Sequence, residues 1–386
     1  MDLELTDEQH DLQAAVASVL AARCPVSLAR HVVEQDPESP AELAGFARTT
    51  RELDWQRLNI PVDHGGLGLG LVEVVVLAEQ MGRVIAPGPL LATVSQFVPM
   101  LTELGSYEQC KRFLAPVAAG DLSGTLALAE RPGGFGLQAL GAGAVESGGA
   151  WTLSGTKSFV MEAGRAEEMV VVARLAGSRA GEGLAAFVVP VAAERVVPMA
   201  VIDESRQLAR VDLDGMRVEP DRALGVPGEC SAGLVRALQQ STVALCAEAV
   251  GTCQTVLDTV IAHVSTREQF GVKIGSFQAL KHKAADMYLA LESARATTYF
   301  AAAAIAEDDP RREIATSVAK ASVGDCVRLV AEEGIQCLGG IAYTWEHDMH
   351  LLVKRAKTAS MLFGTTAEHH RRIAGLIGLG GGQRER

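Results

Sequence analysis

The sequence lacks an excess of positive charge. Its 386 residues contain 35 Lys and Arg against 47 Asp and Glu, which gives a net charge of -12. Phosphate backbones are bound by clusters of Lys and Arg that release counterions, so this balance argues against nucleic acid as a general partner. An acidic surface mainly keeps a protein soluble. Any anionic ligand must therefore be met by local positive groups.

Paired cysteines and metal-binding motifs are also missing. The seven cysteines include no CxxC pair, and the nine histidines form no HExxH motif and no cluster with zinc spacing. We expect the cysteines to be small apolar core residues in a reduced compartment, and we expect no metal site. The N-terminal stretch MDLELTDEQHDL lacks the basic and apolar order of a secretory signal, so we expect a cytoplasmic protein.

A membrane span and a nucleotide-binding sheet are not indicated either. The uncharged run at 84–102 has about the length of a membrane span, but Pro87, Pro89 and Pro99 interrupt it, so we expect a buried helix–loop segment and no membrane span. The glycines at 63–70 do not satisfy GxGxxG, and strands do not alternate with helices. A doubly wound nucleotide-binding sheet is therefore not expected.

The sequence does contain three regions of different periodicity. Residues 1–126 follow a helical period and begin with Thr6 and Gln9, spaced as a capping box. Residues 127–225 form short runs rich in Val and Thr between Gly and Ala clusters, which is typical of antiparallel strands. Helical periodicity returns in residues 226–386. We predict an N-terminal helical domain, a middle β domain and a C-terminal helical domain, so that the fold is mainly α with a central antiparallel β domain.

Within these regions the pattern predicts specific elements. An apolar stripe over 234–264 predicts one long helix, and two further helices are expected at 275–307 and 313–338. Asp214 and Gly215 stand between alternating apolar residues, which predicts a two-residue β-hairpin.

Two stretches carry residue types that suit a nucleotide. In TREQFGVKIGSFQ, Arg267 and Phe270 share a helix face and Gln278 opens the next helix. A guanidinium suits a pyrophosphate, and an amide can bond to ribose or phosphate. The alternative is a helix hairpin with a surface arginine, a core phenylalanine and a capping glutamine.

The second stretch is IQCLGG, in which Gln336 precedes Gly339 and Gly340. Glycine leaves bare backbone that a ligand can approach closely. A helix C-terminus explains the same residues without any ligand.

Together with the helix–sheet–helix layout, the segments LTDEQ, PVDHGGLGLG, REQFG…FQ and QCLGG resemble the acyl-CoA dehydrogenase family over nearly the whole chain. The resemblance implies a C-terminal four-helix bundle, a tetramer of like or unlike chains, and FAD bound between subunits. It also implies α,β-desaturation of an acyl-CoA thioester, with electron-transferring flavoprotein as the acceptor.

The resemblance also implies roles for individual residues. The cofactor-binding residues that it implies are Arg267, Phe270, Gln278, Gln336, Gly339, Gly340, Thr365 and Phe159. The first three match positions that reach the FAD pyrophosphate and ribose from a neighbouring subunit. Gln336 and the two glycines match the adenosine contact. Thr365 matches a threonine near the diphosphate, and Phe159 stands where the family has a tryptophan against the flavin.

The sequence departs from the family at the catalytic base, which is a glutamate near the C-terminus or on the long helix. The matching residues are Phe363 and Ser241, and neither can remove the proton. Glu248 lies two turns beyond Ser241 and is a substitute candidate, with a buried charge-paired glutamate as the alternative. The catalytic residue thus stays open.

The predicted β domain departs as well. Residues 129–136 lack the serine and aspartate of the family stretch, and Met161 replaces a threonine that bonds to the flavin. The losses fall on one side of the cofactor site, which suggests the base-lacking subunit of a heteromeric enzyme. Two alternatives stay open: a flavin oxidase or hydroxylase on the same fold, and a non-catalytic subunit that completes the FAD site of another chain.

Overall fold

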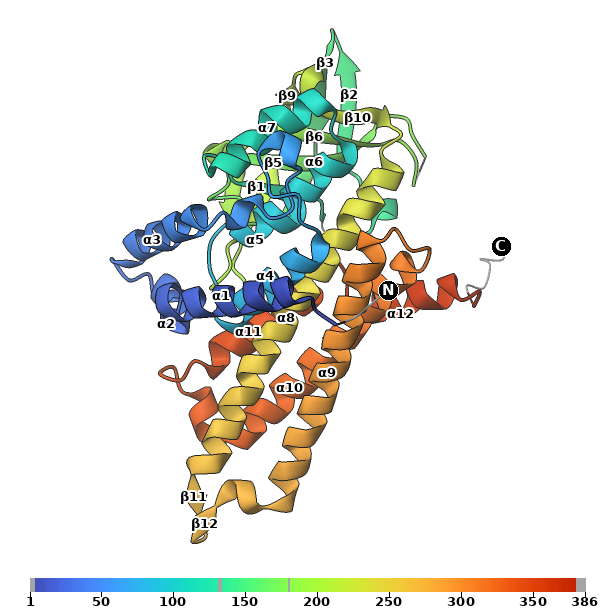
Figure 1. Cartoon of the computed structure of the whole chain (residues 1–386). Helices are drawn as coiled ribbons and strands as arrows, with labels where there is room; N and C mark the ends of the chain where they lie inside the picture. Colours follow the sequence, from blue (N-terminus) through green and yellow to red (C-terminus); the bar gives the residue numbers. More distant parts are fainter. Residues whose placement is uncertain (1–3, 131–133, 180, 380–386) are drawn as a thin grey trace. The chain divides into compact units, whose positions relative to one another are not determined.

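A computed structural model describes residues 4–130, 134–179 and 181–379. Helices precede and follow a middle part built of strands, which confirms the predicted mainly α fold with a central β domain (Figure 1). The chain forms two compact units. The helical unit comprises Met1–Arg30, Val75–Ala86 and Thr242–Arg386, and the sheet unit comprises His31–Val74 and Pro87–Ser241.

The elements follow one another along the chain. The N-terminal part contains α1 (Asp7–Arg23), α2 (Val26–Val33), α3 (Ser39–Glu52), η1 (Trp55–Arg57), η2 (Val62–His64), α4 (Leu71–Arg83), α5 (Leu90–Ala92), η3 (Thr93–Phe97), α6 (Val98–Leu104) and α7 (Tyr107–Ala119). The middle part contains β1 (Gly124–Ala127), η4 (Leu137–Ala139), β2 (Gly143–Ser147), β3 (Ala150–Ser154), β4 (Thr156–Met161), β5 (Glu168–Leu175), β6 (Leu184–Pro190), η5 (Ala193–Arg195), β7 (Val196–Pro198), β8 (Leu208–Asp212), β9 (Met216–Val218), η6 (Pro220–Arg222) and β10 (Ala223–Gly228). The C-terminal part contains α8 (Ser231–Thr266), β11 (Glu268–Gln269), β12 (Val272–Lys273), η7 (Ile274–Ser276), α9 (Gln278–Ala306), α10 (Arg312–Leu338), η8 (Gly339–Tyr343), α11 (Met349–Met361) and α12 (Thr366–Leu376).

Several local predictions are confirmed. The capping box at the start of α1 is formed, because the Gln9 amide donates to Thr6 Oγ1 at 3.3 Å and the Thr6 amide donates to Gln9 Oε1 at 3.0 Å. The predicted long helix is α8, and the two that follow are α9 and α10. The proline-interrupted run at 84–102 is a loop followed by α5, η3 and α6, whose residues are largely buried.

Helix α8 is long and apolar enough to cross a membrane by length and composition, but 72% of its most apolar window is buried inside the protein. A core helix of a large domain has the same character. Its burial therefore explains its composition.

In the helical unit, α4 and α8 approach closely at two glycines. A Cβ atom added to Gly82 would lie 2.0 Å from the Glu248 carbonyl oxygen, and one added to Gly251 would lie 1.8 Å from the Glu79 carbonyl oxygen. Thr252 reinforces the contact by donating from Oγ1 to the Gly82 carbonyl at 2.9 Å. Backbone–backbone contact of this kind is possible only because neither glycine carries a side chain.

The sheet unit contains two sheets. The larger has the strand order β10-β6-β5-β2-β3-β9, with β1 paired to β5, and the smaller has the order β4-β8-β7. Most neighbours are antiparallel, but β1 and β2 both run parallel to β5. The antiparallel β domain is thus confirmed in its main character.

The predicted hairpin at Asp214 and Gly215 is wrong. Strand β8 before the turn pairs with β4 and β7, whereas β9 after it pairs with β3 in the other sheet. Gly215 does adopt a positive φ of 70°, as a tight turn requires. The turn therefore carries the chain from one sheet to the other instead of folding one strand back on the next.

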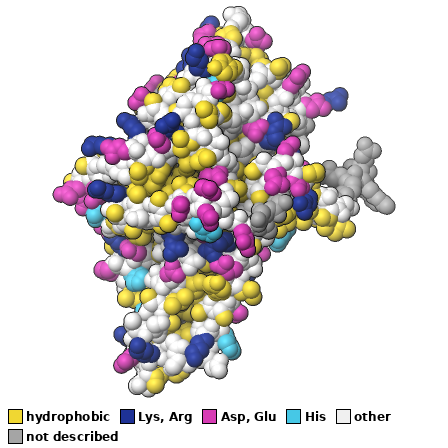
Figure 2. Space-filling view, viewed as in Figure 1, with side chains coloured by type: hydrophobic (Ala, Val, Ile, Leu, Met, Phe, Trp, Pro, Cys, Tyr) yellow, Lys and Arg dark blue, Asp and Glu magenta, His cyan; other side chains and the backbone are white. Residues whose placement is uncertain are grey.

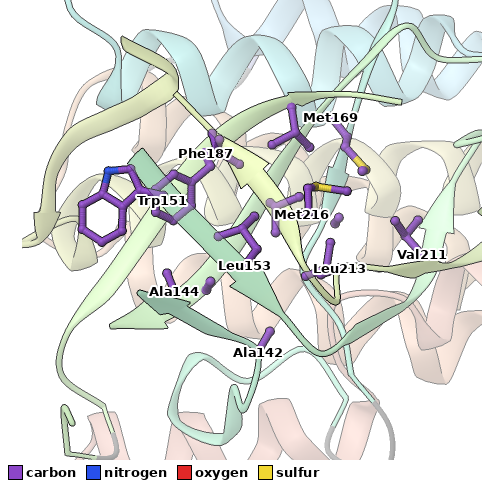
Figure 3. Packing of buried hydrophobic residues seen from close by; sticks show 14 of the residues in the cluster. Ala142, Ala144, Trp151, Leu153, Met169, Phe187, Val211, Leu213 and Met216 are labelled. Atoms are coloured by element: carbon purple, nitrogen blue, oxygen red, sulfur yellow. The ribbon is translucent and has the colours of Figure 1, made fainter. Parts of the chain in front are cut away.

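The core of the sheet unit is filled by alternate side chains of these strands (Figure 3). Trp151 and Phe187 pack as tilted rings with centroids 5.4 Å apart. Leu153, Met169 and Met216 fill the space around them, and all three are buried. This packing fixes the frame on which β4 and its loops are held.

Candidate functional site

The connection between α8 and α9 presents an arginine and a phenylalanine to solvent. Arg267 follows the last residue of α8, and its carbonyl accepts a hydrogen bond from the Ile274 amide at 2.9 Å, which closes the connection. Between them β11 and β12 form a short hairpin that lies at the tip of the helical unit (Figure 1). The predicted residues Arg267, Phe270 and Gln278 thus gather at one end of α8 and α9. The expectation that Arg267 and Phe270 share a helix face is wrong, because α8 ends at Thr266 and Phe270 lies in the turn between β11 and β12.

Phe270 is held in an unusual conformation. Its φ is +54°, a region that bulky residues seldom enter, and its side chain is 92% exposed. The contact described for its ring is an edge-on one with Phe277, at 6.4 Å between centroids. A strained backbone that presents an apolar ring to water gains nothing for folding. Such strain is typical of residues kept for binding.

Arg267 is available to an anion. It is exposed, and among the described residues no carboxylate lies within ion-pair distance of its guanidinium. Gln278 is also exposed, as the first residue of α9. A guanidinium fork and an amide at one end of a helix pair suit the diphosphate and ribose of a dinucleotide.

The second predicted stretch lies at the same end of the helical unit. Lys283 of α9 pairs with Glu333 of α10, so the last turns of α10 run beside the first turns of α9. Gln336 is exposed in the last turn of α10. A Cβ atom added to Gly339 or Gly340 would meet nothing within 4 Å, so the backbone there is open to a ligand.

Thr365 lies apart from these residues. It is the N-cap of α12, where Oγ1 accepts from the Glu368 amide at 3.3 Å and lies 2.8 Å from Glu368 Oε2. The next residue, Thr366, lies against Gly324. Gly324 precedes Gln336 by twelve residues of α10, or about 18 Å along the helix axis. Thr365 and Gln336 of one chain therefore lie too far apart to contact the same group of a bound cofactor.

The sheet unit places Phe159 at an irregularity of β4. The pairing of β4 with β8 shifts between Lys157 and Val160, and Phe159 has a φ of +56°. Its amide lies 3.4 Å from Met199 Sδ, and its side chain is half-buried. Beside it Lys157 is buried and paired with Glu130 at 2.5 Å, and burial lowers the pKa of Lys157 to about 8.

Met161, two residues on, does not offer a hydrogen-bond donor. Its sulfur lies 2.8 Å from Gln96 Nε2 and 3.7 Å from a guanidinium nitrogen of Arg206, which is 2% exposed. Sequence reasoning missed Arg206, because nothing in its neighbourhood along the chain indicates burial. The loop that should contact the flavin begins with Ala129, but residues 131–133 lie outside the described residues.

The two usual base positions hold no acid. Phe363 is half-buried with a φ of +59°, and Gly364 follows with a φ of +112°. His369 Nε2 lies 3.1 Å from the Phe363 carbonyl oxygen, so this nitrogen carries the proton. Burial lowers the pKa of His369 to about 4, and His369 is neutral near pH 7. Ser241 is buried and donates to the Ala237 carbonyl at 3.0 Å.

Glu248 faces an arginine. The Glu248 carboxylate lies 3.8 Å from Arg355 Nη1, and the two side chains are 1% and 2% exposed. Arg355 also donates to the carbonyls of Ile85 and Ala86, at 2.8 and 3.0 Å. This geometry favours the charge-paired alternative over a base. Asp348 is likewise paired, with Arg30 at 2.7 Å. Over residues 4–130, 134–179 and 181–379, no group of three or more His, Cys, Asp or Glu could hold a metal ion.

Helices before and after a β domain, with Arg267 and Gln278 at one end of a helix pair, agree with the class that the resemblance implies, the acyl-CoA dehydrogenases. Family models agree: residues 6–121, 125–227 and 234–377 match the N-terminal, middle and C-terminal domains of acyl-CoA dehydrogenase. The chain belongs to the acyl-CoA dehydrogenase family, whose members are FAD-dependent oxidoreductases.

Individual relatives agree with this assignment. The chain is 28% identical to the probable acyl-CoA dehydrogenase FadE25 of Mycobacterium tuberculosis, over 94% of each chain. It is 28% identical to the human mitochondrial short-chain specific acyl-CoA dehydrogenase, over 82% of this chain and 78% of the relative. A solved structure of the ChsE4-ChsE5 complex from Mycobacterium tuberculosis matches with a TM-score of 0.86 and 25% identity, over 98% of this chain and 99% of that one.

Proposed function

We propose that this chain is the subunit of a heteromeric acyl-CoA dehydrogenase that supplies a nucleotide clamp while its partner supplies the base. The observation that carries the proposal is an asymmetry. Arg267 is exposed and has no ion pair among the described residues. Phe363 and Ser241 hold no group that can accept the α proton. The similarity to the ChsE4-ChsE5 complex supports an assembly of unlike chains.

The residues of this chain fit FAD at the clamp. Arg267 would bind the pyrophosphate, Gln278 would bond to ribose or phosphate, and the open backbone at Gly339 and Gly340 would admit the adenosine end. When bound, FAD supplies the acceptor for the hydride that leaves the β carbon of an acyl-CoA thioester. In this proposal the chain binds and orients FAD, and a carboxylate of the partner removes the α proton of the thioester. Electron-transferring flavoprotein is the proposed acceptor, and the proposed assembly is a tetramer.

The rate expected of the lone chain follows from the missing base. General base catalysis contributes about 10²–10⁴ in rate, so the isolated chain should turn over acyl-CoA at least a hundredfold more slowly than the complex. If the complex is equally slow on every acyl-CoA but consumes oxygen with another substrate, the oxidase or hydroxylase alternative is the better one. If this chain binds a partner without changing its FAD content or its rate, both catalytic readings fail.

The test compares the chain alone with the chain co-purified with a second acyl-CoA dehydrogenase-like chain that carries a glutamate at the position matching Phe363. Bound FAD and dye reduction are measured in both samples. Arg267→Ala in the complex should lower bound FAD, whereas Lys273→Ala in the same exposed hairpin removes an equal charge and should leave it unchanged. Full FAD loading and fast turnover by the lone chain would overturn the proposal.

A further inference from the structure

A cavity of about 350 Å³ lies in the sheet unit between α3, the loop before α5 and the loop after α7. Its walls are mainly apolar and include Leu43, Phe46, Ala47, Pro87, Leu90 and Leu122. Apolar side chains gather on the surface where α3 and α5 lie (Figure 2). None of its residues belongs to the proposed FAD clamp or to the base positions.

The floor of the cavity holds an unused hydrogen-bond acceptor. Gln56 lines the cavity and is 7% exposed. Its Nε2 donates to the Ala118 carbonyl at 3.3 Å, which fixes the orientation of the amide, and its Oε1 has no hydrogen-bond partner among the described residues. A buried acceptor without a partner has lost its hydrogen bond to water, so a donor that reaches Gln56 Oε1 would be bound favourably.

The hydroxyl groups that line the cavity cannot supply that donor. Thr50 donates to the Ala47 carbonyl at 2.9 Å. Thr93 lies 3.0 Å from the Pro89 carbonyl and 3.1 Å from the Gly124 carbonyl. Both hydroxyl protons are thus directed to backbone oxygens. A donor for Gln56 Oε1 can therefore come only from a molecule that enters the cavity, a water or a ligand.

Three of the four charged side chains that line the cavity have partners in the protein. Arg51 donates to the Gly120 carbonyl, and Arg165 pairs with Glu162 at 2.8 Å. Glu167 accepts from the Ser123 amide and hydroxyl at 2.6 and 2.7 Å. The fourth charged group of the lining is the exposed carboxylate of Asp121, so two arginines and two carboxylates balance in charge. A lining without net charge favours a neutral molecule.

We propose that this cavity is a second ligand site for a small, neutral, mainly apolar molecule that carries one hydrogen-bond donor. Ligand sites in proteins are largely apolar, occupy roughly 300–1,000 Å³ and use a few placed polar groups. An apolar cavity of about 150 Å³ is enough for benzene. A volume of about 350 Å³ therefore accommodates a two-ring aromatic alcohol, whose hydroxyl donates to Gln56 Oε1.

The test uses 2-naphthol as the probe and the full chain as the protein, with binding followed by the fluorescence of the probe. Saturable binding of one probe per chain is expected. Ala47→Trp fills the cavity from an exposed position of α3 and should weaken binding at least tenfold. Ala41→Trp adds the same ring to an exposed position of α3 that does not line the cavity, and should leave binding unchanged.

A second comparison tests the hydrogen bond. 2-Methoxynaphthalene lacks the donor and should bind roughly three to ten times more weakly than 2-naphthol, the value of one neutral hydrogen bond. Gln56→Leu, checked for folding by thermal unfolding, should remove that difference. Equal effects of Ala47→Trp and Ala41→Trp, or no saturable binding, would overturn the proposal. Neither result bears on FAD binding, which is measured separately.

Discussion

Arg355 and Glu248 face each other inside the helical unit, with 3.8 Å between Nη1 and Oε1 and with both side chains almost fully buried. Two opposite charges removed from water depend on each other, because each would be left uncompensated without its partner. Arg355 is held further by two backbone carbonyls. The pair therefore gives a structural reason for a carboxylate on an apolar stretch of α8.

Glu248→Gln should destabilise the protein. The substitution keeps the shape of the side chain but removes the charge that faces the buried Arg355, and breaking a buried ion pair costs about 3–5 kcal/mol. A large fall in the midpoint of thermal or denaturant unfolding is expected. Glu346→Gln, at an exposed carboxylate, is the control and should change the midpoint little. A Glu248→Gln variant with unchanged stability and lost turnover would instead identify Glu248 as the base.

Phe363→Glu should give the chain a base of its own. The left-handed backbone at Phe363 and Gly364 is already formed and is held by His369, so the change replaces a side chain and not the turn. In the chain alone, supplied with excess FAD, Phe363→Glu should raise dye reduction by up to about 10²–10⁴ over the unsubstituted chain. Phe363→Gln is isosteric without the proton-accepting charge and should give no gain.

Gly251→Ala should push α8 away from α4. The added methyl group would lie 1.8 Å from the Glu79 carbonyl oxygen, which is backbone and cannot turn aside. Overpacking of this kind costs about 3 kcal/mol or more, measured as a lower free energy of unfolding. Gly45→Ala in α3 is the matched control, since an added Cβ meets nothing within 4 Å there. It should stabilise the protein by about 0.5–1 kcal/mol through helix propensity. A loss at Gly45 equal to that at Gly251 would contradict the close approach.

Stability should fall on mild acidification because of His369. Burial lowers its pKa to about 4, and the positive charges of Lys320 and Arg372 act in the same direction. The unfolded chain, with an ordinary pKa of 6.5, takes up a proton that the folded chain refuses. The free energy of unfolding should therefore drop by about 2 kcal/mol between pH 7 and pH 5. His369→Gln should remove that part of the pH dependence, as measured by denaturant unfolding at both pH values.

The sequence predicted the elements whose cause is local. The capping box at Thr6 and the apolar stripe of α8 depend on residues a few positions apart, so their spacing is enough. The turn at Asp214 and Gly215 is local too, but the partner of the following strand is not. Met216 pairs with Leu153 in the other sheet, and no pattern around the turn indicates it. The domain limits 1–126, 127–225 and 226–386 stay a prediction.

In the candidate site, too, the sequence predicted the residues that stand in one short motif but not the contacts between residues far apart along the chain. Arg267 and Phe270 stand in one short motif, and the structure places them together at the tip of the helical unit. The pairing of Glu248 with Arg355, and the burial of Arg206 beside Met161, join residues far apart along the chain. Such contacts depend on tertiary packing, which one sequence does not display. All the FAD contacts stay predictions, namely those of Arg267, Phe270, Gln278, Gln336, Gly339, Gly340, Thr365 and Phe159.

The turn between β11 and β12, where Phe270 has a positive φ, has a consequence for the rate of the proposed subunit association. The Phe270 ring is exposed and its backbone is already set in the folded chain, so in the proposed assembly an approaching subunit would have no loop to order. A contact through a side chain that is already in place costs little conformational entropy when the subunits bind. Subunit association should then proceed at a rate limited by orientation, without a slow rearrangement after first encounter.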